Sequence, residues 1–432
     1  MVDGEEKDLP PPGPIGQAGT GPTLPTIMPG DATPPAESRT RNRGQRGLAR
    51  YYAYSLSSNI DLSGGIWILY LQDRGVSIAQ IGLAEACFHL APVTLELPSG
   101  SIADVLGRKW SLMIGSLALA LSAMLMLGAS SLWIVMLAMY LNGASFAFRS
   151  GAGQAFLYDT MAANDATTGF ARVFGRLISM NYLIIGATVW LGAVLADIDF
   201  TWPYLIIVGV ALATAYLASG LKEPERERTA HRSLTRTVAE AVQIVRGRPG
   251  LAALLGFTAS LWTLLALVGL YAQAVLAEQG LRTSTIGLVI GATLVFTAIG
   301  SWVAHQLSAR AAFTTWTVIA AVAIVLGGVG LGSGILLAGL AAYLVAEFAA
   351  GIYEPLLADR INTNLSAAHR ATILSVEGFL FSITMIWAFP LFGWVAGRYG
   401  WLLAYAASGG VVLVLLAIWL TLSRRPAPGA LA

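Results

Sequence analysis

The stretch Glu96–Leu112 reads ELPSGSIADVLGRKWSL and lies between two long apolar runs. A short polar segment in that position predicts a tight hairpin between two membrane helices. Gly100 predicts a close approach of two helix backbones, and Gly107 predicts a turn conformation that other residues resist. Arg108 and Lys109 predict that this loop faces the cytoplasm, because short basic loops stay on that side of a membrane.

The composition predicts a polytopic membrane protein. The chain has 432 residues, of which 56% are hydrophobic and 12% charged, and its mean hydropathy is +0.67. Soluble domains carry about twice that share of charged residues. The net charge of +2 and the placing of the cations in short loops give no support for nucleic-acid binding. No phosphate loop, nucleophile triad or metal cluster is recognisable, so neither an enzyme nor a bound cofactor or metal is expected.

Twelve runs are long and apolar enough to cross a membrane, which takes about 20 residues each. They fall in two sets of six, at 51–72, 78–103, 110–129, 131–156, 173–196 and 202–221, and at 251–277, 284–307, 312–332, 334–359, 371–396 and 400–423.

These runs divide the chain into five parts. Residues 1–45 are rich in Pro and Gly and predict a disordered cytoplasmic tail, whose basic edge would lie against anionic membrane lipid. Residues 46–221 and 251–423 predict two six-helix bundles, joined by a cytoplasmic linker at 222–250 that contains an amphipathic helix. A second cytoplasmic tail follows at 424–432.

The basic residues predict the orientation. Of the 26 Lys and Arg, only Arg74, Arg282 and Arg398 fall in predicted outer loops. Both termini are therefore expected in the cytoplasm, and the protein in the cell membrane.

The two halves resemble each other in sequence. Gly75–Leu83 pairs with Gly280–Leu288, and Ala103–Lys109 pairs with Ala304–Arg310, at one common offset near 200. A parallel duplication of six helices predicts two bundles related by an axis along the membrane normal.

The order Gly-x-x-Ala-Asp-x-x-Gly-Arg-Lys, from Gly100 to Lys109, resembles the signature loop of the major facilitator superfamily (MFS). The resemblance extends over about residues 46–423 and implies an all-α fold of twelve membrane helices. It implies that the first, fourth, seventh and tenth helices line a central cavity. It also implies that Asp104 braces the two bundles in the outward-facing state and that Arg108 keeps Asp104 oriented. His305 stands at the aspartate's place in the second copy.

Two carboxylates are expected near the middle of the membrane, Asp61 on the first helix and Glu347 on the tenth. Ionisable groups at that depth are costly unless they are paired or hydrated, so both are candidates for proton or substrate coupling. The alternative is a static packing contact, for which Ser57, Ser58 and Asn59 offer partners to Asp61.

Further ionisable residues lie within the predicted helices. Glu85, His89 and Glu96 share one face of the second helix, where Glu85 and His89 could exchange protons or form a structural pair. Arg149 on the fourth helix lies at the depth of Glu96, which predicts a buried ion pair. Glu377 lies near the cytoplasmic end of the eleventh helix and is expected to act in gating or loop anchoring.

Aromatic residues also occur within the helices rather than only at their ends: Trp67, Trp262, Tyr271, Tyr343 and Trp387. Around a cavity they would suit bulky, partly apolar and cationic solutes, whereas elsewhere they would only pack.

Together these features predict a monomeric, proton-coupled secondary transporter that works by alternating access and exports hydrophobic, drug-like small molecules. The segment Gly186–Gly192 lacks the proline that drug antiporters of this superfamily usually carry there. Proton-linked uptake of a small metabolite is therefore the alternative, and a non-enzymatic membrane sensor is an alternative of another class.

Overall fold

The computed structural model describes residues 36–163, 169–223, 249–308, 310–364 and 367–423. Residues 1–42 and 43–432 form separate compact units, and the contacts below belong to the second. The predicted amphipathic helix and C-terminal tail fall almost entirely outside the described residues. The predicted disordered tail is wrong for residues 36–45, because helix α1 already begins at Ala36.

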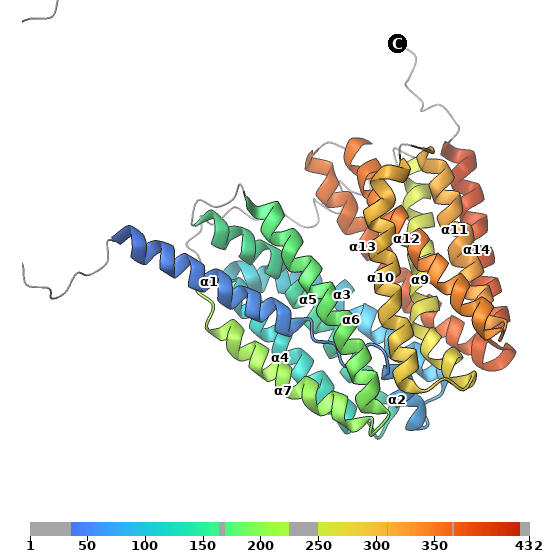
Figure 1. The fold of residues 1–432 in the computed structure, drawn as a ribbon, viewed down its shortest axis with the longest axis horizontal. Coiled ribbons are helices and arrows are strands. Elements are labelled where there is room, and N and C mark those ends of the chain that lie inside the picture. Colours follow the sequence, from blue (N-terminus) through green and yellow to red (C-terminus); the bar gives the residue numbers. More distant parts are fainter. Residues whose placement is uncertain (1–35, 164–168, 224–248, 309, 365–366, 424–432) are drawn as a thin grey trace, which may run out of the picture. The chain divides into compact units, whose positions relative to one another are not determined.

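The described residues of the first half contain seven helices (Figure 1). They are α1 (Ala36–Ser58), α2 (Trp67–Asp73), α3 (Ile78–Val105), α4 (Arg108–Leu127), α5 (Leu132–Ala162), α6 (Phe170–Ala196) and α7 (Thr201–Ser219). The described residues of the second half contain α9 (Pro249–Glu278), α10 (Thr283–Ser308), α11 (Phe313–Gly332), α12 (Leu336–Asn364), α13 (Ala367–Tyr399) and α14 (Trp401–Ser423).

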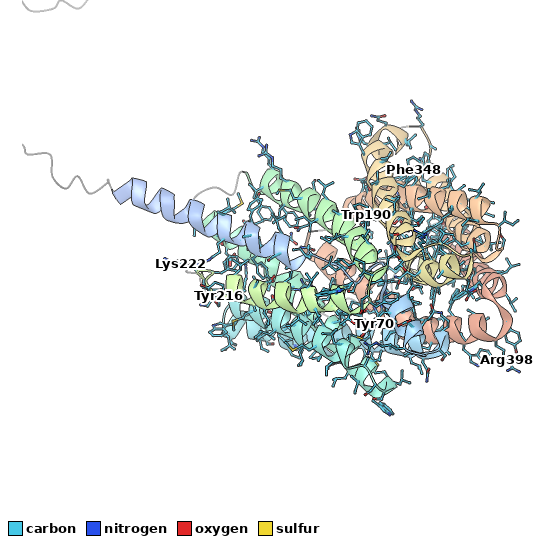
Figure 2. The ribbon with its side chains drawn as sticks, turned by 60° about the horizontal axis from the view of Figure 1, so that its bottom comes forward. Tyr70, Trp190, Tyr216, Lys222, Phe348 and Arg398 are labelled. Carbon is cyan, nitrogen blue, oxygen red and sulfur yellow. The ribbon has the colours of Figure 1, made fainter. Side chains whose placement is uncertain are left out.

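Eleven helices of the described chain are long and apolar enough to cross a membrane, and they match eleven of the twelve predicted runs. Large apolar and aromatic side chains face outward on them. Trp190 on α6 and Tyr216 on α7 are examples, with 46% and 74% of their surface exposed (Figure 2). Such a surface suits a lipid environment, since soluble monomers rarely expose large apolar patches. The fold is that of an all-helical membrane protein.

The prediction of one continuous helix over 51–72 is wrong. Helix α1 ends at Ser58, residues 59–66 are not helical, and α2 is only seven residues long. The sequence of this interruption, NIDLSGGI, explains it. Asn, Asp and Ser side chains compete for backbone hydrogen bonds, and each Gly costs a helix about 1 kcal/mol relative to Ala. Residues 59–66 are called the helix break below.

The two halves repeat the same pairings. Helices α3 and α5 pack against each other in the first half, as α10 and α12 do in the second. Gly143 lies against the carbonyl of Phe88 in one pair, and Gly300 lies against the carbonyl of Phe348 in the other. The expected close approach at Gly100 is wrong, because no described atom lies within 4 Å of the place where its Cβ would be.

Within the described residues, the main contacts between the two halves are those of α3 with α13, of α6 with α10, and of α2 with α9. Gly82 of α3 lies against the backbone of Pro390, and Gly287 of α10 lies against Ala193 of α6. Gly82 lies near the end of α3 that follows the loop at residues 74–77, and Gly287 and Ala193 lie near the ends of α10 and α6 on the same side of the molecule (Figure 1). The halves are therefore closely packed at the end with loop 74–77.

Candidate functional site

A cavity of about 460 Å³ lies beside the helix break. Its walls are mostly apolar, with Phe88, Met126, Phe146, Ile185, Val189, Ile207, Leu270, Ile290 and Leu294 among the lining residues. Polar groups lie mainly in the first half of the chain, and they include Ser58, Asn59, Asp61, Ser63, Glu85, Asn142, Arg149 and Tyr204. Small-molecule sites in proteins have this volume and this combination of apolar walls with a few polar groups.

Asp61 lies in the helix break and not on a helix, which corrects the prediction. Its Oδ1 accepts hydrogen bonds from the backbone N–H groups of Ser63 and Gly64, at 3.1 and 2.7 Å, and from the Ser63 hydroxyl at 3.2 Å. The backbone N–H of Asp61 donates to Thr188 Oγ1 of α6 at 3.0 Å. The predicted partners at 57–59 are thus replaced by residues on the other side of Asp61 in the sequence and by α6.

Gln273 of α9 fills two further hydrogen-bonding positions next to the break. Its Nε2 donates to the Gly64 carbonyl at 2.9 Å, and its Oε1 accepts from the backbone N–H of Ile68 at 3.2 Å. Its side chain is almost fully buried, with 1% of the residue exposed. Because a buried backbone group without a partner is costly, this one side chain from the second half stabilises the broken crossing of the first.

Arg149 contacts the end of α1 and does not form the predicted ion pair with Glu96. Its Nη1 donates to the Ser58 carbonyl at 2.6 Å, and its Nε donates to the Ser145 carbonyl at 3.2 Å. Glu96 is exposed and lies between two prolines within α3, Pro92 and Pro98, so it does not share the buried position of Glu85. A guanidinium at a helix C-terminus satisfies a carbonyl that has no partner within the helix.

Glu85 and His89 of α3 form a buried pair, with 3.4 Å between Glu85 Oε1 and His89 Nε2. Glu85 lines the cavity. His89 packs edge-on against Phe381 of α13, with 5.4 Å between ring centres. This pair therefore lies between the cavity and the α3–α13 contact of the two halves.

Glu347 of α12 does not line the cavity. Its Oε2 lies 3.0 Å from the hydroxyl of Thr297 on α10. Thr293, one turn before Thr297, does line the cavity. The side chains of these two threonines thus lie between the cavity and Glu347.

The structure separates the predicted cavity aromatics. Trp67 lines the cavity, whereas Tyr343 is buried and Trp262 donates its indole N–H to Glu377 Oε1 at 3.3 Å. Tyr271 stacks on Phe389 with 4.5 Å between ring centres.

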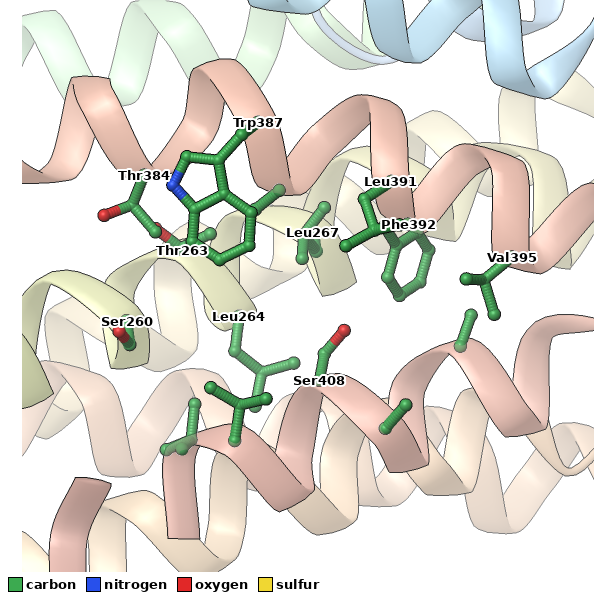
Figure 3. A pocket seen from close by; sticks show the side chains of 15 residues that line it. Ser260, Thr263, Leu264, Leu267, Thr384, Trp387, Leu391, Phe392, Val395 and Ser408 are labelled. Atoms are coloured by element: carbon green, nitrogen blue, oxygen red, sulfur yellow. The ribbon is translucent and has the colours of Figure 1, made fainter. Parts of the chain in front are cut away.

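Trp387 lies at a smaller, separate cavity of about 150 Å³ between α9, α13 and α14 (Figure 3). The side chains lining it are mainly apolar, with Thr384, Ser408 and two other hydroxyl residues among them. Of these five aromatic residues, only Trp67 lines the larger cavity.

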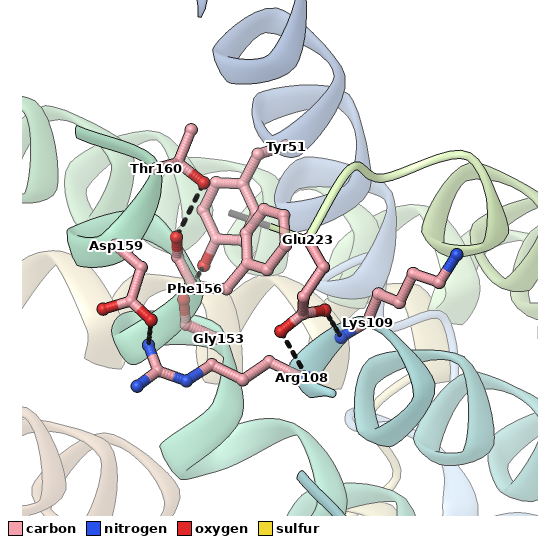
Figure 4. Close-up of polar contacts among 8 residues, drawn as sticks. All are labelled: Tyr51, Arg108, Lys109, Gly153, Phe156, Asp159, Thr160 and Glu223. Carbon is pink, nitrogen blue, oxygen red and sulfur yellow. Dashed lines mark hydrogen bonds and ion pairs between the residues drawn. The ribbon is translucent and has the colours of Figure 1, made fainter. Parts of the chain in front are cut away.

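The signature loop is held by two carboxylates (Figure 4). Arg108 Nη1 forms an ion pair with Asp159 Oδ2 of α5 at 2.7 Å. This partner was not predicted from the sequence. Glu223 accepts hydrogen bonds from the backbone N–H groups of Arg108 and Lys109, at 2.8 and 3.0 Å. Gly107 has φ of 107°, a conformation that favours glycine, and a Cβ there would press on Glu223.

Sequence reasoning missed Thr188, Gln273, Thr297 and Glu223 as functional partners. Gln273 had a visible signal, since an amide within a predicted membrane helix needs a partner. The two threonines had none, because a membrane-helix threonine normally satisfies its hydroxyl on its own backbone.

Comparisons with known proteins agree with this fold. The family model described as "Major Facilitator Superfamily" matches residues 51–388. Among curated proteins, the uncharacterized MFS-type transporter YxaM of Bacillus subtilis (strain 168) is 25% identical over 55% of this chain. EfpA of Mycobacterium tuberculosis is 25% identical over 42% of it. The matched region spans 61% and 37% of the length of these two relatives.

The solved structures with a similar fold include the nucleoside transporter NupG, with TM-score 0.72 and 13% identity over 88% of this chain and 100% of that chain. A bacterial homologue of the human lysosomal transporter Spinster, in an inward-facing and unoccupied conformation, has TM-score 0.67 and 15% identity over 90% of this chain and 99% of that chain. At this identity the likeness concerns the fold. With the family match over residues 51–388, the repeated helix pairings of the two halves and the cavity lined by both, the chain belongs to the Major Facilitator Superfamily.

Proposed function

We propose that the chain is a proton-coupled transporter that works by alternating access and exports hydrophobic, drug-like small molecules. The observation that carries this proposal is the cavity beside the helix break. Its long apolar walls favour a hydrophobic solute, and Trp67 and Glu85 within it favour one that also carries a cationic group. Broken membrane helices are typical of substrate and ion sites in transporters, because non-helical backbone at that depth must line a cavity or be buried in protein.

The arrangement of the halves supports an inward-facing state for this structure. The contacts of α3 with α13 and of α6 with α10 gather at the end with loop 74–77. The distribution of basic residues favours an orientation with that loop outside the cell and both termini in the cytoplasm. In that orientation the outer end is closed.

Proton coupling requires at least one group that binds and releases a proton during the cycle. Asp61 and Glu347 are the proposed groups, and their contacts differ. Asp61 Oδ1 accepts three hydrogen bonds, whereas Glu347 is bonded to one hydroxyl. The contacts favour Glu347 as the group that titrates and Asp61 as a support for the break.

The test is the accumulation of a lipophilic cationic dye in expressing cells, with and without a protonophore. Export predicts lower accumulation than in control cells, and the protonophore should abolish the difference. Glu347→Gln should also abolish it, whereas Glu278→Gln, an exposed carboxylate on α9 bonded to Trp401, should leave it unchanged. A difference that persists with the protonophore would refute proton coupling.

Proton-linked uptake of a small polar metabolite is the second candidate. Asn59, Asn142 and Arg149 line the cavity and could orient a polar solute. In this case a labelled solute should accumulate above the control, and the protonophore should lower its level.

A further inference from the structure

Glu347 of α12 and Thr297 of α10 form a contact between two polar side chains, with 3.0 Å between Oε2 and Oγ1. We infer that the Thr297 hydroxyl is a proton-dependent switch, which reports the protonation state of Glu347 to the cavity wall at Thr293. The inference rests on the proposed proton coupling and assigns Thr297 a positioning role for that proton.

The Thr297 hydroxyl lies within hydrogen-bonding distance of two acceptor oxygens. Thr297 Oγ1 lies 3.0 Å from Glu347 Oε2 and also 3.0 Å from the backbone carbonyl of Thr293. A hydroxyl has one hydrogen to donate, so it cannot donate to both oxygens at once. One of these two contacts must change its donor whenever Glu347 gains or loses a proton.

The two protonation states therefore have different hydrogen bonds. With Glu347 protonated, the carboxyl O–H donates to Thr297 Oγ1, and the Thr297 hydroxyl donates to the Thr293 carbonyl. When Glu347 loses its proton to water, its O–H bond is broken and the carboxylate can only accept. The Thr297 hydroxyl must then rotate toward Glu347, and the Thr293 carbonyl keeps only its helical N–H partner.

Close helix packing confines the change to the hydroxyl. Gly351 lies against the backbone of Thr297, and Gly300 lies against the backbone of Phe348 and Ile352. Ser301 also donates to the Gly351 carbonyl at 2.9 Å. Since α10 and α12 touch through their backbones at Thr297 and again at Gly300, sliding one helix along the other would create clashes, whereas a rotation of the hydroxyl moves no backbone atom.

Thr293, whose carbonyl gains or loses the hydrogen bond from Thr297, is also part of the cavity wall. It lines the cavity, and its own hydroxyl donates to the Ile290 carbonyl at 2.7 Å. Ile290 lines the cavity as well. A solute that contacts this turn of α10 therefore meets a different electrostatic surface in the two states.

The surroundings of Glu347 leave it as the group that titrates here. Its ionisable neighbour is Tyr343, one turn earlier on α12, which interacts with Glu347 and hydrogen bonds with Thr293. Of the other helices packed against α12, α11 has no ionisable residue, and α10 carries only His305, two turns beyond Thr297. Helix α9 offers Tyr271 within the membrane, and α13 offers Glu377, which is bonded to Trp262.

The experiment is a pH titration of the carboxylic C=O stretching band of the purified transporter by difference infrared spectroscopy, without substrate. Glu347→Gln identifies the band. Thr297→Val removes the hydroxyl at nearly constant shape, and Thr297→Ser, which keeps a hydroxyl, is the matched control. A charged acceptor gains more from the hydroxyl than a neutral carboxyl loses without it. We therefore expect Thr297→Val to change the band frequency and to move its midpoint up by about one pH unit, a tenfold change in the equilibrium.

Thr297→Ser should leave both the frequency and the midpoint near those of the unchanged protein. Thr297→Ala replaces Thr297→Val if the valine variant does not fold. A midpoint and frequency unaffected by loss of the hydroxyl would overturn the switch, while proton-driven transport lost in Glu347→Gln would still support the proposed function. Proton-independent transport by the unchanged protein would instead refute the proposed function itself.

Discussion

The first membrane crossing and its counterpart in the second half have opposite constructions. The first is broken between α1 and α2, whereas α9 is one helix of 30 residues. Both crossings end in a glycine with positive φ, Gly75 at 78° and Gly280 at 84°. Counting back equally from these two glycines places the apolar Ala266 opposite Asp61.

This difference shows how a duplicated half can specialise. The apolar middle of α9 keeps the helix intact, and its buried Gln273 supplies the hydrogen bonds that the broken crossing lacks. The second half therefore acts as a support for the polar site of the first. Each of the following changes tests that relation, from the largest expected effect to the smallest.

Asp61→Ala should have the largest effect, because it removes the acceptor for three donors in the helix break. We expect a loss of about 3 kcal/mol of stability, since hydrogen bonds to a charged group contribute about 1.5–3 kcal/mol each and water will replace part of them. Transport should fall at least tenfold. Asp61→Asn keeps one acceptor oxygen and should retain proton-driven transport. Denaturant unfolding in detergent and transport in liposomes measure the two quantities, and equal losses in both variants would contradict the supporting role.

Gly192→Ala should follow, because Gly192 of α6 lies against the backbone of Leu62 in the break. An added methyl group cannot be accommodated by a side-chain movement there, and overpacking of this kind costs about 1–3 kcal/mol. Gly256→Ala on α9 is the control. It has no atom within 4 Å of the new methyl group, so the better helix former should leave stability unchanged or raise it. The thermal unfolding temperatures of the two variants measure this difference in stability. A Gly192→Ala protein as stable as the unchanged protein would show that the break can move away from α6.

Gln273→Leu removes both hydrogen bonds from α9 to the break at similar volume. The Gly64 carbonyl and the Ile68 N–H are then left without this partner, which should cost about 2 kcal/mol. Gln279→Leu, one residue beyond the end of α9 and remote from the break, should cost less than half of that. If unfolding midpoints of the two variants agree, Gln273 does not support the break.

Ser63→Ala should have the smallest effect, about 0.5–1 kcal/mol, because it removes one hydroxyl bond of 3.2 Å and leaves the two backbone donors to Asp61 in place. Combined with Asp61→Ala it should add nothing further. A double-mutant cycle measured by denaturant unfolding tests this, and full additivity would show that the two side chains act independently.

The sequence predicted the fold well where the signal was local. Eleven apolar runs became eleven helices because length and hydropathy are properties of a single segment. The break was missed because the apolar residues Ile60, Leu62 and Ile66 kept the average hydropathy high, although the polar and glycine residues between them favour a non-helical segment.

The site was predicted less well, because its contacts join distant parts of the chain. Gln273 bonds to residues that lie 205 and 209 positions away. Arg108 meets Asp159, and Arg149 meets the Ser58 carbonyl instead of Glu96. Which of several buried partners a charged group selects depends on helix rotation and on prolines such as Pro92 and Pro98, and neither can be read from residue spacing.

The Gln273 contact also sets an order of events during synthesis. The contacts of Glu223 with Arg108 and Lys109 join residues of the first half only, so they can form once residue 223 has entered the membrane or emerged from the ribosome. The break cannot be completed then, because its partner lies 50 residues later in the chain. Domains generally fold in the order in which they are made. The Gly64 carbonyl of the newly made first half therefore lacks this partner until α9 is inserted beside it, and the helix break cannot reach its final structure before then.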